Sequence, residues 1–270
     1  MNLISKSDEL SDEIIINGEV VFSPDICRIM AGPCAVESRD QIMFTAEKLC
    51  DMGIRVFRAG SFKPRTNPYS FQGAEDQGLR WLEEVREQYG MLIITETSDY
   101  SNFYPVEEAT DIIQIGAKSM YDRSLLRAAG KSTKPILLKR HFGATVEELF
   151  KMSEFALLEG NRNIMYCERG IRTFESSSRF TLDLCGAAAI KNQTKAPLIL
   201  DPSHSMGYTY GVPDITKACV AFGCGGILIE VHHDPQNAQC DKDQALDLDA
   251  FKELYLTLKE IGAVCGKQVE

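Results

Sequence analysis

Four residues with metal-binding side chains are spread widely along the chain: a thiol at Cys34, an imidazole at His204 and carboxylates at Glu230 and Asp241. Together they form a donor set suited to a divalent ion of the Mn²⁺, Fe²⁺, Co²⁺ or Zn²⁺ class rather than to magnesium. Such an ion can act as a Lewis acid. Taken alone, the same residues are more simply explained as a buried thiol and a structural histidine. The metal hypothesis therefore depends on the elements that hold them.

A second set of residues is cationic, and its members also follow short apolar runs. They are Arg58, Lys63, Arg65, Lys118, Lys139, Arg140 and Arg169. Clustered cations repel one another unless an anion neutralises them. Arginine suits bidentate recognition of phosphate and carboxylate, and lysine suits recognition by a point charge. We therefore expect a site for a polyanionic small molecule, the alternative being ion pairs with local carboxylates.

Both sets lie at or after the ends of eight apolar runs, which we predict to be strands. These runs are 27–31, 55–58, 91–95, 111–115, 135–138, 163–167, 197–200 and 226–231. Helical patterns occur at 41–52, 73–89, 123–129, 145–159, 179–191, 214–222 and 250–261, with a weaker one at 105–109. Strands that alternate with helices indicate a parallel sheet. Eight such units predict an α/β protein with a (β/α)₈ TIM barrel. The alternative is an open doubly wound sheet, but no GxGxxG follows the first strand.

The first part of the chain predicts a separate small element. Asn17-Gly18 lies between two β-rich runs and is a strong hairpin signal. We expect an N-terminal tail and β-hairpin at residues 1–25 and a catalytic barrel at residues 26–265. In a closed barrel the first and eighth strands are neighbours, as are the seventh and eighth. This arrangement would bring Cys34, His204, Glu230 and Asp241 together.

Composition excludes several other classes of protein. The net charge is −10 and the pI is near 5.0, which argues against nucleic acid as a partner. Nine cysteines are scattered without a CxxC pair, so neither a disulfide framework nor a zinc ribbon is expected. The longest apolar runs are too short to cross a membrane, and the first residues lack the layout of a signal peptide. We expect a cytoplasmic protein without a membrane partner.

Seven segments, in order, resemble 3-deoxy-D-arabino-heptulosonate 7-phosphate (DAHP) synthases of the subfamily related to 3-deoxy-D-manno-octulosonate 8-phosphate (KDO8P) synthases. They are 31–38 (AGPCAVES), 57–73 (FRAGSFKPRTNPYSFQG), 114–117 (QIGA), 137–140 (LLKR), 167–175 (CERGIRTFE), 201–205 (DPSHS) and 229–232 (IEVH). The resemblance implies condensation of phosphoenolpyruvate with erythrose 4-phosphate and water, releasing phosphate, as the first step of the shikimate pathway. It also implies a homodimer or homotetramer.

The resemblance further implies roles for individual residues. The implied metal ligands are Cys34, His204, Glu230 and Asp241. The implied contacts to phosphoenolpyruvate are Arg58, Lys63, Lys139 and Arg169, with Lys118 at a position where the family usually has arginine. The implied contacts to the aldose phosphate are Pro64, Arg65 and Thr66. We expect Lys63, Cys34 and His204 to take part in catalysis, with Lys63 donating or relaying a proton if neighbouring cations lower its pKa.

Some residues depart from the family pattern and leave alternatives open. Lys118, and His141 in place of the usual glycine, put the second substrate in more doubt than the first. The alternatives are a KDO8P synthase-like enzyme, a synthase of specialised metabolism that uses a different aldose phosphate, and a barrel that has lost catalysis and only binds. The residues that would position the attacking water are also open, among Glu96, Glu168 and Asp201.

Overall fold

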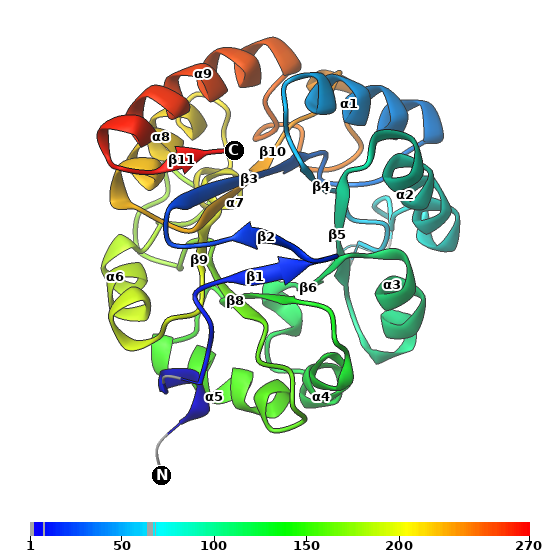
Figure 1. The fold of residues 1–270 in the computed structure, drawn as a ribbon. Coiled ribbons are helices and arrows are strands. Elements are labelled where there is room, and N and C mark those ends of the chain that lie inside the picture. The colour runs from blue at the N-terminus through cyan, green and yellow to red at the C-terminus, as the bar shows by residue number, and fades with distance from the viewer. Residues whose placement is uncertain (1–2, 8, 64–66, 68) are drawn as a thin grey trace.

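The computed structural model describes residues 3–7, 9–63, 67 and 69–270. Its centre is a closed barrel of eight parallel strands (Figure 1), and the pairing of β10 with β3 closes it. The barrel strands are β3 (Ile26–Gly32), β4 (Val56–Arg58), β5 (Leu92–Thr97), β6 (Ile112–Ile115), β7 (Ile136–Lys139), β8 (Ile164–Glu168), β9 (Leu198–Leu200) and β10 (Gly226–Glu230). The predicted TIM barrel is confirmed, and each of the eight predicted strands is present.

Helices surround the barrel, as Figure 1 shows. They are α1 (Arg39–Asp51), α2 (Glu75–Tyr89), α3 (Phe103–Ala109), α4 (Arg123–Lys131), α5 (Val146–Leu157), α6 (Leu184–Gln193), α7 (Pro202–Met206), α8 (Val212–Phe222) and α9 (Leu248–Val264). Single 3₁₀ turns occur at η1 (Ile4–Lys6), η2 (Tyr100–Asn102), η3 (Ala117–Ser119) and η4 (Pro235–Asn237). A short strand, β11 (Gln268–Val269), pairs with the start of β3.

The predicted helix at 179–191 begins later than expected. Helix α6 starts at Leu184 because the carboxylate of Asp183 caps it, accepting a hydrogen bond from the amide of Gly186 at 2.7 Å. Residues 171–183 form a loop, which is closed by a bridge between Ile171 and Thr181. This loop places Arg179 and Phe180 at the rim of the barrel rather than on an outer helix.

The N-terminal hairpin is formed by β1 (Ile14–Ile16) and β2 (Glu19–Phe22). Asn17 and Gly18 have φ angles of 54° and 83°, the left-handed pair that a two-residue hairpin turn needs. The hairpin lies across one end of the barrel (Figure 1), and buried Ile14 and Phe22 pack against side chains of the barrel interior. Only three residues connect the end of β2 at Phe22 to the start of β3 at Ile26, so the hairpin closes the amino-terminal end of the barrel. Within the part of the chain that the structure describes, no helix is long and apolar enough to cross a membrane.

Candidate metal and substrate site

A cavity of about 460 Å³ opens at the carboxyl-terminal ends of the barrel strands. Polar side chains dominate its lining, as expected where βα loops carry function. The lining residues are Lys63, Asn67, Ser70, Glu96, Ala117, Lys118, Lys139, Phe142, Arg169, Arg179, Phe180, His204 and Asp241.

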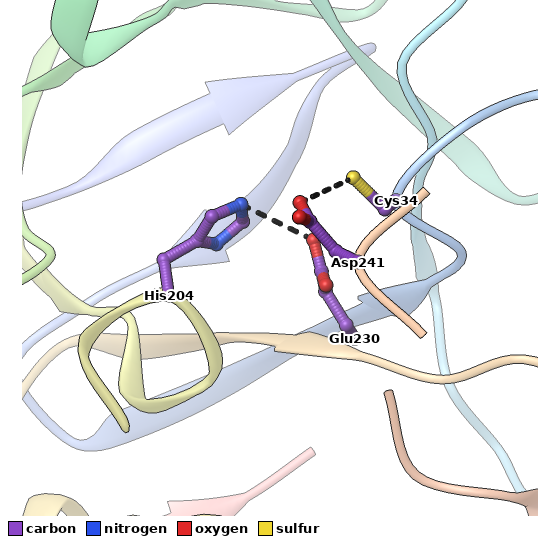
Figure 2. A group of neighbouring side chains, drawn as sticks. All are labelled: Cys34, His204, Glu230 and Asp241. Carbon is purple, nitrogen blue, oxygen red and sulfur yellow. Dashed lines mark hydrogen bonds and ion pairs between the residues drawn. The ribbon is translucent and has the colours of Figure 1, made fainter. Parts of the chain in front are cut away.

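The four residues predicted to bind metal lie together at this end of the barrel (Figure 2). Each of Cys34, His204, Glu230 and Asp241 offers a ligand atom, and these atoms all lie within 4.8 Å of one another. The Cys34 thiol donates a hydrogen bond to Asp241 Oδ2 at 3.1 Å, and His204 Nε2 lies 3.2 Å from Glu230 Oε1. The barrel therefore brings together residues separated by up to 207 positions in the chain.

Local backbone chemistry explains how these side chains reach one point. Cys34 follows β3, and Gly32 allows the end of that strand to come close to β4, because a Cβ there would lie 2.3 Å from the carbonyl oxygen of Arg58. Glu230 is the last residue of β10. Asp241 has a φ of 52°, a left-handed conformation that Asp tolerates better than most residues. His204 lies on the short helix α7, which Asp201 caps.

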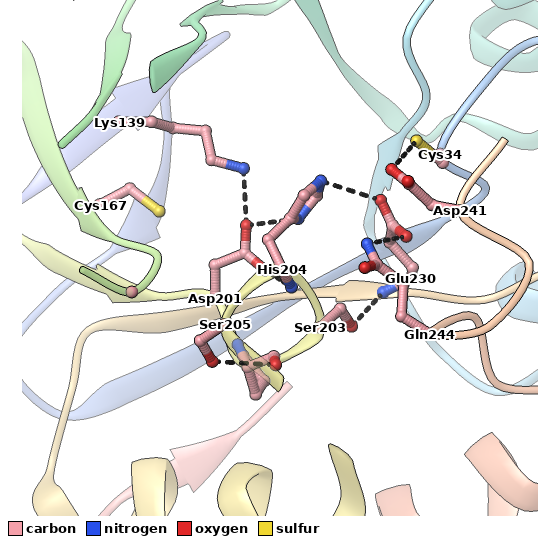
Figure 3. A network of polar contacts seen from close by, with 12 residues as sticks. Cys34, Lys139, Cys167, Asp201, Ser203, His204, Ser205, Glu230, Asp241 and Gln244 are labelled. Carbon is pink, nitrogen blue, oxygen red and sulfur yellow. Dashed lines mark hydrogen bonds and ion pairs between the residues drawn. The ribbon is translucent and has the colours of Figure 1, made fainter. Parts of the chain in front are cut away.

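Asp201 connects the metal candidates with the cations. Its Oδ2 accepts a hydrogen bond from Lys139 Nζ at 2.6 Å and lies 2.8 Å from Nδ1 of His204 (Figure 3). A carboxylate beside Nδ1 favours the tautomer that carries the proton there, so Nε2 keeps its lone pair. Burial lowers the pKa of His204 despite the attraction of Asp201, so the ring is neutral near pH 7.

The donor set fits a divalent ion. The lone pair of His204 Nε2 faces a carboxylate oxygen of Glu230 at 3.2 Å, and two acceptors at that distance repel unless a cation or a proton lies between them. Thiolate, imidazole and two carboxylates are ligands that borderline transition metals share. The side chains of His204 and Glu230 are only 12% and 1% exposed, so their lone pairs are withheld from bulk water.

Both carboxylates of the cluster are held by neighbouring side chains. Glu230 accepts hydrogen bonds from Arg58 Nη1 at 2.9 Å and from Gln244 Nε2 at 2.6 Å. Asp241 accepts from Arg179 Nη1 at 3.3 Å. Burial alone would raise the pKa of Asp241, but the positive charge that His204 carries once it is protonated, together with Arg179 and the hydrogen bond from Cys34, holds that pKa well below its ordinary value. The carboxylate of Asp241 is therefore ionised.

Four of the predicted cations line the cavity: Lys63, Lys118, Lys139 and Arg169. Arg169 is buried, and its Nη1 has no hydrogen-bond partner among the described residues, an arrangement that an incoming anion would satisfy. Its guanidinium stacks on Phe180 at 4.3 Å from the ring centroid, which fixes the plane of its donors. The cavity thus offers converging positive charge beside the metal candidates.

The other predicted cations have different positions. Arg58 does not line the cavity and lies beneath it, where it binds Glu230 and the carbonyl oxygen of Pro33. Arg140 does not line it either, because its Nη1 is 2.8 Å from both Glu168 and Asp183. The local ion pairs that the sequence left as an alternative therefore do occur at Arg140.

The expected aldose phosphate segment is only partly described. Pro64, Arg65 and Thr66 lie outside the described residues. Asn67 and Ser70, which follow this segment, both line the cavity.

The expected lowering of the Lys63 pKa is wrong for this structure. Burial opposes the charged form, but the sulfur atoms of Cys34 and Cys240 and the carboxylate of Glu96 hold the pKa of Lys63 above its ordinary value. Its Nζ lies 3.2 Å from Cys34 Sγ, so Lys63 is a fixed cation beside the sulfur. Contact with Cys240 and burial both raise the pKa of the Cys34 thiol, whereas the charge of Lys63 lowers it.

Of the three carboxylates considered for positioning water, Glu96 alone lines the cavity. Glu168 is fully buried and accepts hydrogen bonds from Arg140 and the amide of Gly170. Asp201 is buried against Lys139 and His204. Because Glu96 is the carboxylate that faces the cavity, its position favours it over Glu168 and Asp201 as the residue that positions the attacking water.

Several residues of the site were missed in the sequence. Phe142 and Phe180 stack with their ring centroids 5.0 Å apart and form an apolar wall of the cavity, while Arg179 lines it beside them. Buried Cys240 lies with its sulfur 3.1 Å from that of Cys34. The helical pattern at 179–191 placed Arg179 and Phe180 on an outer helix, whereas they lie in the loop before α6. Only the proximity of these residues to recognised motifs could have indicated them.

The three other histidines of the chain lie outside the cavity lining. The ring of His141 packs against that of Phe142, which does line the cavity, with 4.0 Å between the ring centroids and 33° between the ring planes. His232 is buried, and its Nε2 lies 3.6 Å from Glu37. His233 is exposed.

Comparison with known proteins finds a matching family model and several curated relatives. The family model described as the DAHP synthetase I family matches residues 13–265. A curated relative from Thermotoga maritima, named phospho-2-dehydro-3-deoxyheptonate aldolase, is 42% identical over 267 residues, which cover 99% of this chain and 79% of the relative. A 2-dehydro-3-deoxyphosphooctonate aldolase from Magnetococcus marinus is 30% identical over 254 residues, which cover 87% of this chain and 88% of the relative.

Solved structures agree with these matches. The crystal structure of the T. maritima phospho-2-dehydro-3-deoxyheptonate aldolase (DAHP synthase) superimposes with a TM-score of 0.93 at 42% identity, covering 96% of this chain and 76% of that one. A truncated form of 3-deoxy-D-arabino-heptulosonate 7-phosphate synthase from T. maritima gives a TM-score of 0.89 at 37% identity, covering 97% and 96%. Because the family model and these relatives match almost its entire length, the chain belongs to the DAHP synthetase I family.

Proposed function

We propose a substrate arrangement and residue roles for this chain, which by its family is a DAHP synthase acting at the first step of the shikimate pathway. The reaction condenses phosphoenolpyruvate with erythrose 4-phosphate and water, giving DAHP and phosphate. One observation carries the proposal: a cluster of thiol, imidazole and two carboxylates lies at the edge of a cavity lined by cations. We assign the catalytic barrel to residues 26–265.

The family is metal-dependent, and the cluster is suited to holding an ion. Cys34, His204, Glu230 and Asp241 would hold a divalent ion of the Mn²⁺, Fe²⁺, Co²⁺ or Zn²⁺ class, which when bound would supply Lewis acidity toward the aldehyde oxygen. In the protein itself, Asp201 orients the imidazole of His204, and Lys63 stabilises the thiolate form of Cys34. These contacts prepare the ligands before an ion arrives.

Phosphoenolpyruvate carries a carboxylate and a phosphate on three carbons, so its recognition needs several fixed cations. Lys63, Lys118, Lys139 and Arg169 converge on the cavity, and the unpartnered Nη1 of Arg169 can donate to a phosphate or carboxylate oxygen. We assign these four residues to phosphoenolpyruvate. Arg58 acts through Glu230 rather than by direct contact.

The same cations suit the chemistry that follows. Charge develops on the departing phosphate, and donors that are already fixed in place stabilise it without reorganising. Lys139 is held by Asp201 at 2.6 Å, and Arg169 is held by stacking on Phe180. Glu96 faces the cavity and accepts a hydrogen bond from Gln114 at 2.9 Å, so we assign it to positioning the water that attacks C2.

The second substrate is assigned to the region around the Lys63-Pro64-Arg65-Thr66 segment. The resemblance of this segment to the erythrose 4-phosphate motif supports the assignment, as do Asn67 and Ser70 in the lining. The KDO8P alternative predicts arabinose 5-phosphate in the same place. We also propose, on the family resemblance, that the enzyme is a cytoplasmic homodimer or homotetramer.

A panel of aldose phosphates with phosphoenolpyruvate, run with and without a chelator, tests the proposal. We expect phosphate release only when phosphoenolpyruvate, erythrose 4-phosphate and a divalent ion are all present. Much faster turnover with arabinose 5-phosphate would establish the octulosonate alternative. If phosphoenolpyruvate binds in calorimetry without turnover on any aldose phosphate, the barrel is a binding subunit and the catalytic proposal is wrong.

A further inference from the structure

The two carboxylates of the metal cluster are joined by a hydrogen-bonded bridge. Gln244 donates from Nε2 to Glu230 Oε2 at 2.6 Å (Figure 3), and its Oε1 accepts from Arg179 Nη1 at 3.1 Å. The same Arg179 nitrogen donates to Asp241 Oδ1 at 3.3 Å. A chain of contacts therefore runs from one carboxylate to the other through Gln244 and Arg179.

The amide of glutamine is chemically suited to the middle of this bridge. It donates through nitrogen toward the Glu230 carboxylate and accepts through oxygen from a guanidinium, and it does both without carrying a charge. A carboxylate at position 244 would repel Glu230, and an aliphatic side chain would leave its Oε2 without this donor. Gln244 is only 2% exposed, so water cannot easily replace its hydrogen bonds.

Both members of the bridge are themselves held in place. The backbone amide of Gln244 donates to the carbonyl oxygen of Asp241 at 3.1 Å, and Leu246, two residues on, donates to the carbonyl oxygen of Glu230 at 3.0 Å. The stem of Arg179 lies over Gly207, where a Cβ would approach Arg179 Cβ to 2.5 Å. The segment after β10 is thus tied back to the strand that carries Glu230.

We propose that Gln244 and Arg179 are positioning residues, which fix the orientation of the Glu230 and Asp241 carboxylates for a divalent ion. The inference rests on the proposed function, because it takes those two carboxylates as ligands. Glu230 has one oxygen directed by Arg58 and the other by Gln244, so loss of the bridge frees the carboxylate to rotate. Gln244 does not line the cavity and acts only through other side chains.

Titration of the metal-free protein with Co²⁺ tests the inference, followed by the thiolate-to-cobalt absorption band that Cys34 would give. Gln244→Leu keeps the approximate volume and removes both hydrogen bonds, and we expect about 10- to 100-fold weaker Co²⁺ binding, the usual effect of losing such a partner. Arg179→Met breaks the bridge from its half-exposed end and is expected to weaken binding similarly. Arg179→Met still tests the inference if Gln244→Leu, which changes a buried residue, folds poorly.

The double variant distinguishes one bridge from two separate effects. If Gln244 and Arg179 act as a unit, Gln244→Leu/Arg179→Met loses little more affinity than either single change, whereas independent effects multiply. The KM for phosphoenolpyruvate is expected to stay near the wild-type value when Gln244 alone is changed and the ion is saturating. If Gln244 only stabilised the fold, its loss would not weaken Co²⁺ binding while leaving the KM for phosphoenolpyruvate unchanged.

Asn161→Leu is the matched control, because Asn161 is another buried amide that bonds to the backbone far from the cluster. It should lower thermal stability and leave Co²⁺ affinity unchanged. Wild-type affinity in both Gln244→Leu and Arg179→Met would overturn the inference while leaving the proposed function intact. Absence of Co²⁺ binding by the wild-type protein would overturn both.

Discussion

At the scale of the residue, Cys34 is held in the cluster by contacts with three side chains. Its sulfur contacts Asp241, Lys63 and Cys240, all within 3.2 Å. A hydroxyl or methyl group at this position cannot supply a soft anionic ligand. The thiol therefore has a role that its burial alone would not require.

Cys34→Ala is expected to reduce metal-dependent turnover by at least about 100-fold while the fold survives, since it removes a ligand and few packing contacts. Parallel measurements of phosphate release, Co²⁺ binding and circular dichroism check this outcome. Full activity with unchanged Co²⁺ binding would remove Cys34 from the metal site.

The pair formed by Cys34 and Cys240 makes a second prediction at this scale. Their sulfur atoms are 3.1 Å apart, so a shift of about 1 Å would reach the length of a disulfide bond. Hydrogen peroxide is expected to oxidise the two thiols of the metal-free protein to a disulfide, with its two oxygen atoms leaving as water. The mass of the protein falls by about 2 Da and Co²⁺ binding is lost.

Peptide mapping after peroxide treatment identifies the bond, and dithiothreitol should restore binding. Cys240→Ser removes the partner thiol and should give no such link. Cys265, an exposed cysteine at the end of α9, offers the matched control, because Cys265→Ser should leave the link unchanged. Linked peptides other than 34 with 240 would contradict the prediction.

Residue types and their places after strands were enough to predict which side chains meet. Cys34, His204, Glu230 and Asp241 could be selected because each has a ligating group and lies at or beyond the end of a strand. Gln244 and Arg179 could not, since an amide and an arginine in a loop fit many roles. Their function depends on distances of about 3 Å that only the folded loops define.

At the scale of the element, helix starts are set by capping side chains, as α5 illustrates. The Thr145 hydroxyl accepts from the amide of Glu148 at 3.1 Å, and the Glu148 carboxylate accepts from the amide of Thr145 at 2.8 Å. This reciprocal pair satisfies backbone amides that the helix itself leaves unpaired. The cap lies on the outer ring of helices, and neither residue lines the cavity.

Thr145→Ala is expected to lower the free energy of unfolding by about 1 kcal/mol, with little change in kcat or KM. Thr145→Ser retains the hydroxyl and should stay within about 0.5 kcal/mol of the wild type. Urea denaturation of the three proteins, with turnover at saturating substrate, provides the comparison. An equal loss in both variants would show that the methyl group, not the cap, is responsible.

Element positions were predictable where hydrophobic periodicity was strong, as in the eight barrel strands. The start of α6 was not, because residues 179–183 look helical in isolation and Asp183 overrides that pattern by capping. The short helix α7 was also missed. Its residues Pro202–Met206 carry no amphipathic repeat, and their conformation is set by the Asp201 cap and the proline.

At the scale of the whole molecule, barrel closure positions the site and the hairpin closes the opposite end. Closure could be predicted from the number of strands, because eight parallel strands that alternate with helices form a barrel in which the eighth strand pairs with the first. The Asn-Gly turn predicted the hairpin itself. Its packing against the barrel interior could only be inferred in general terms, because contacts between distant segments depend on the final shape of both surfaces.

Substitution of Phe22 tests how much the packing of the hairpin on the barrel stabilises the molecule, independently of the metal and substrate site. Its side chain is fully buried between the hairpin and the inward-facing residues of the barrel, among them Met30 and Leu228. Phe22→Ala is expected to reduce the free energy of unfolding by about 3–5 kcal/mol through lost burial and the cavity left behind. Val20→Ala on the same strand changes a side chain that is 40% exposed and should cost less than about 1 kcal/mol.

Because the hairpin and the metal cluster lie at opposite ends of the barrel, Phe22→Ala should leave Co²⁺ affinity and turnover per folded molecule unchanged below its unfolding transition. Urea unfolding followed by tryptophan fluorescence and circular dichroism, combined with Co²⁺ titration at low temperature, separates the two effects. If Co²⁺ affinity falls in proportion to stability, the hairpin and the site are coupled through the barrel interior, and the amino-terminal end is more than a structural closure.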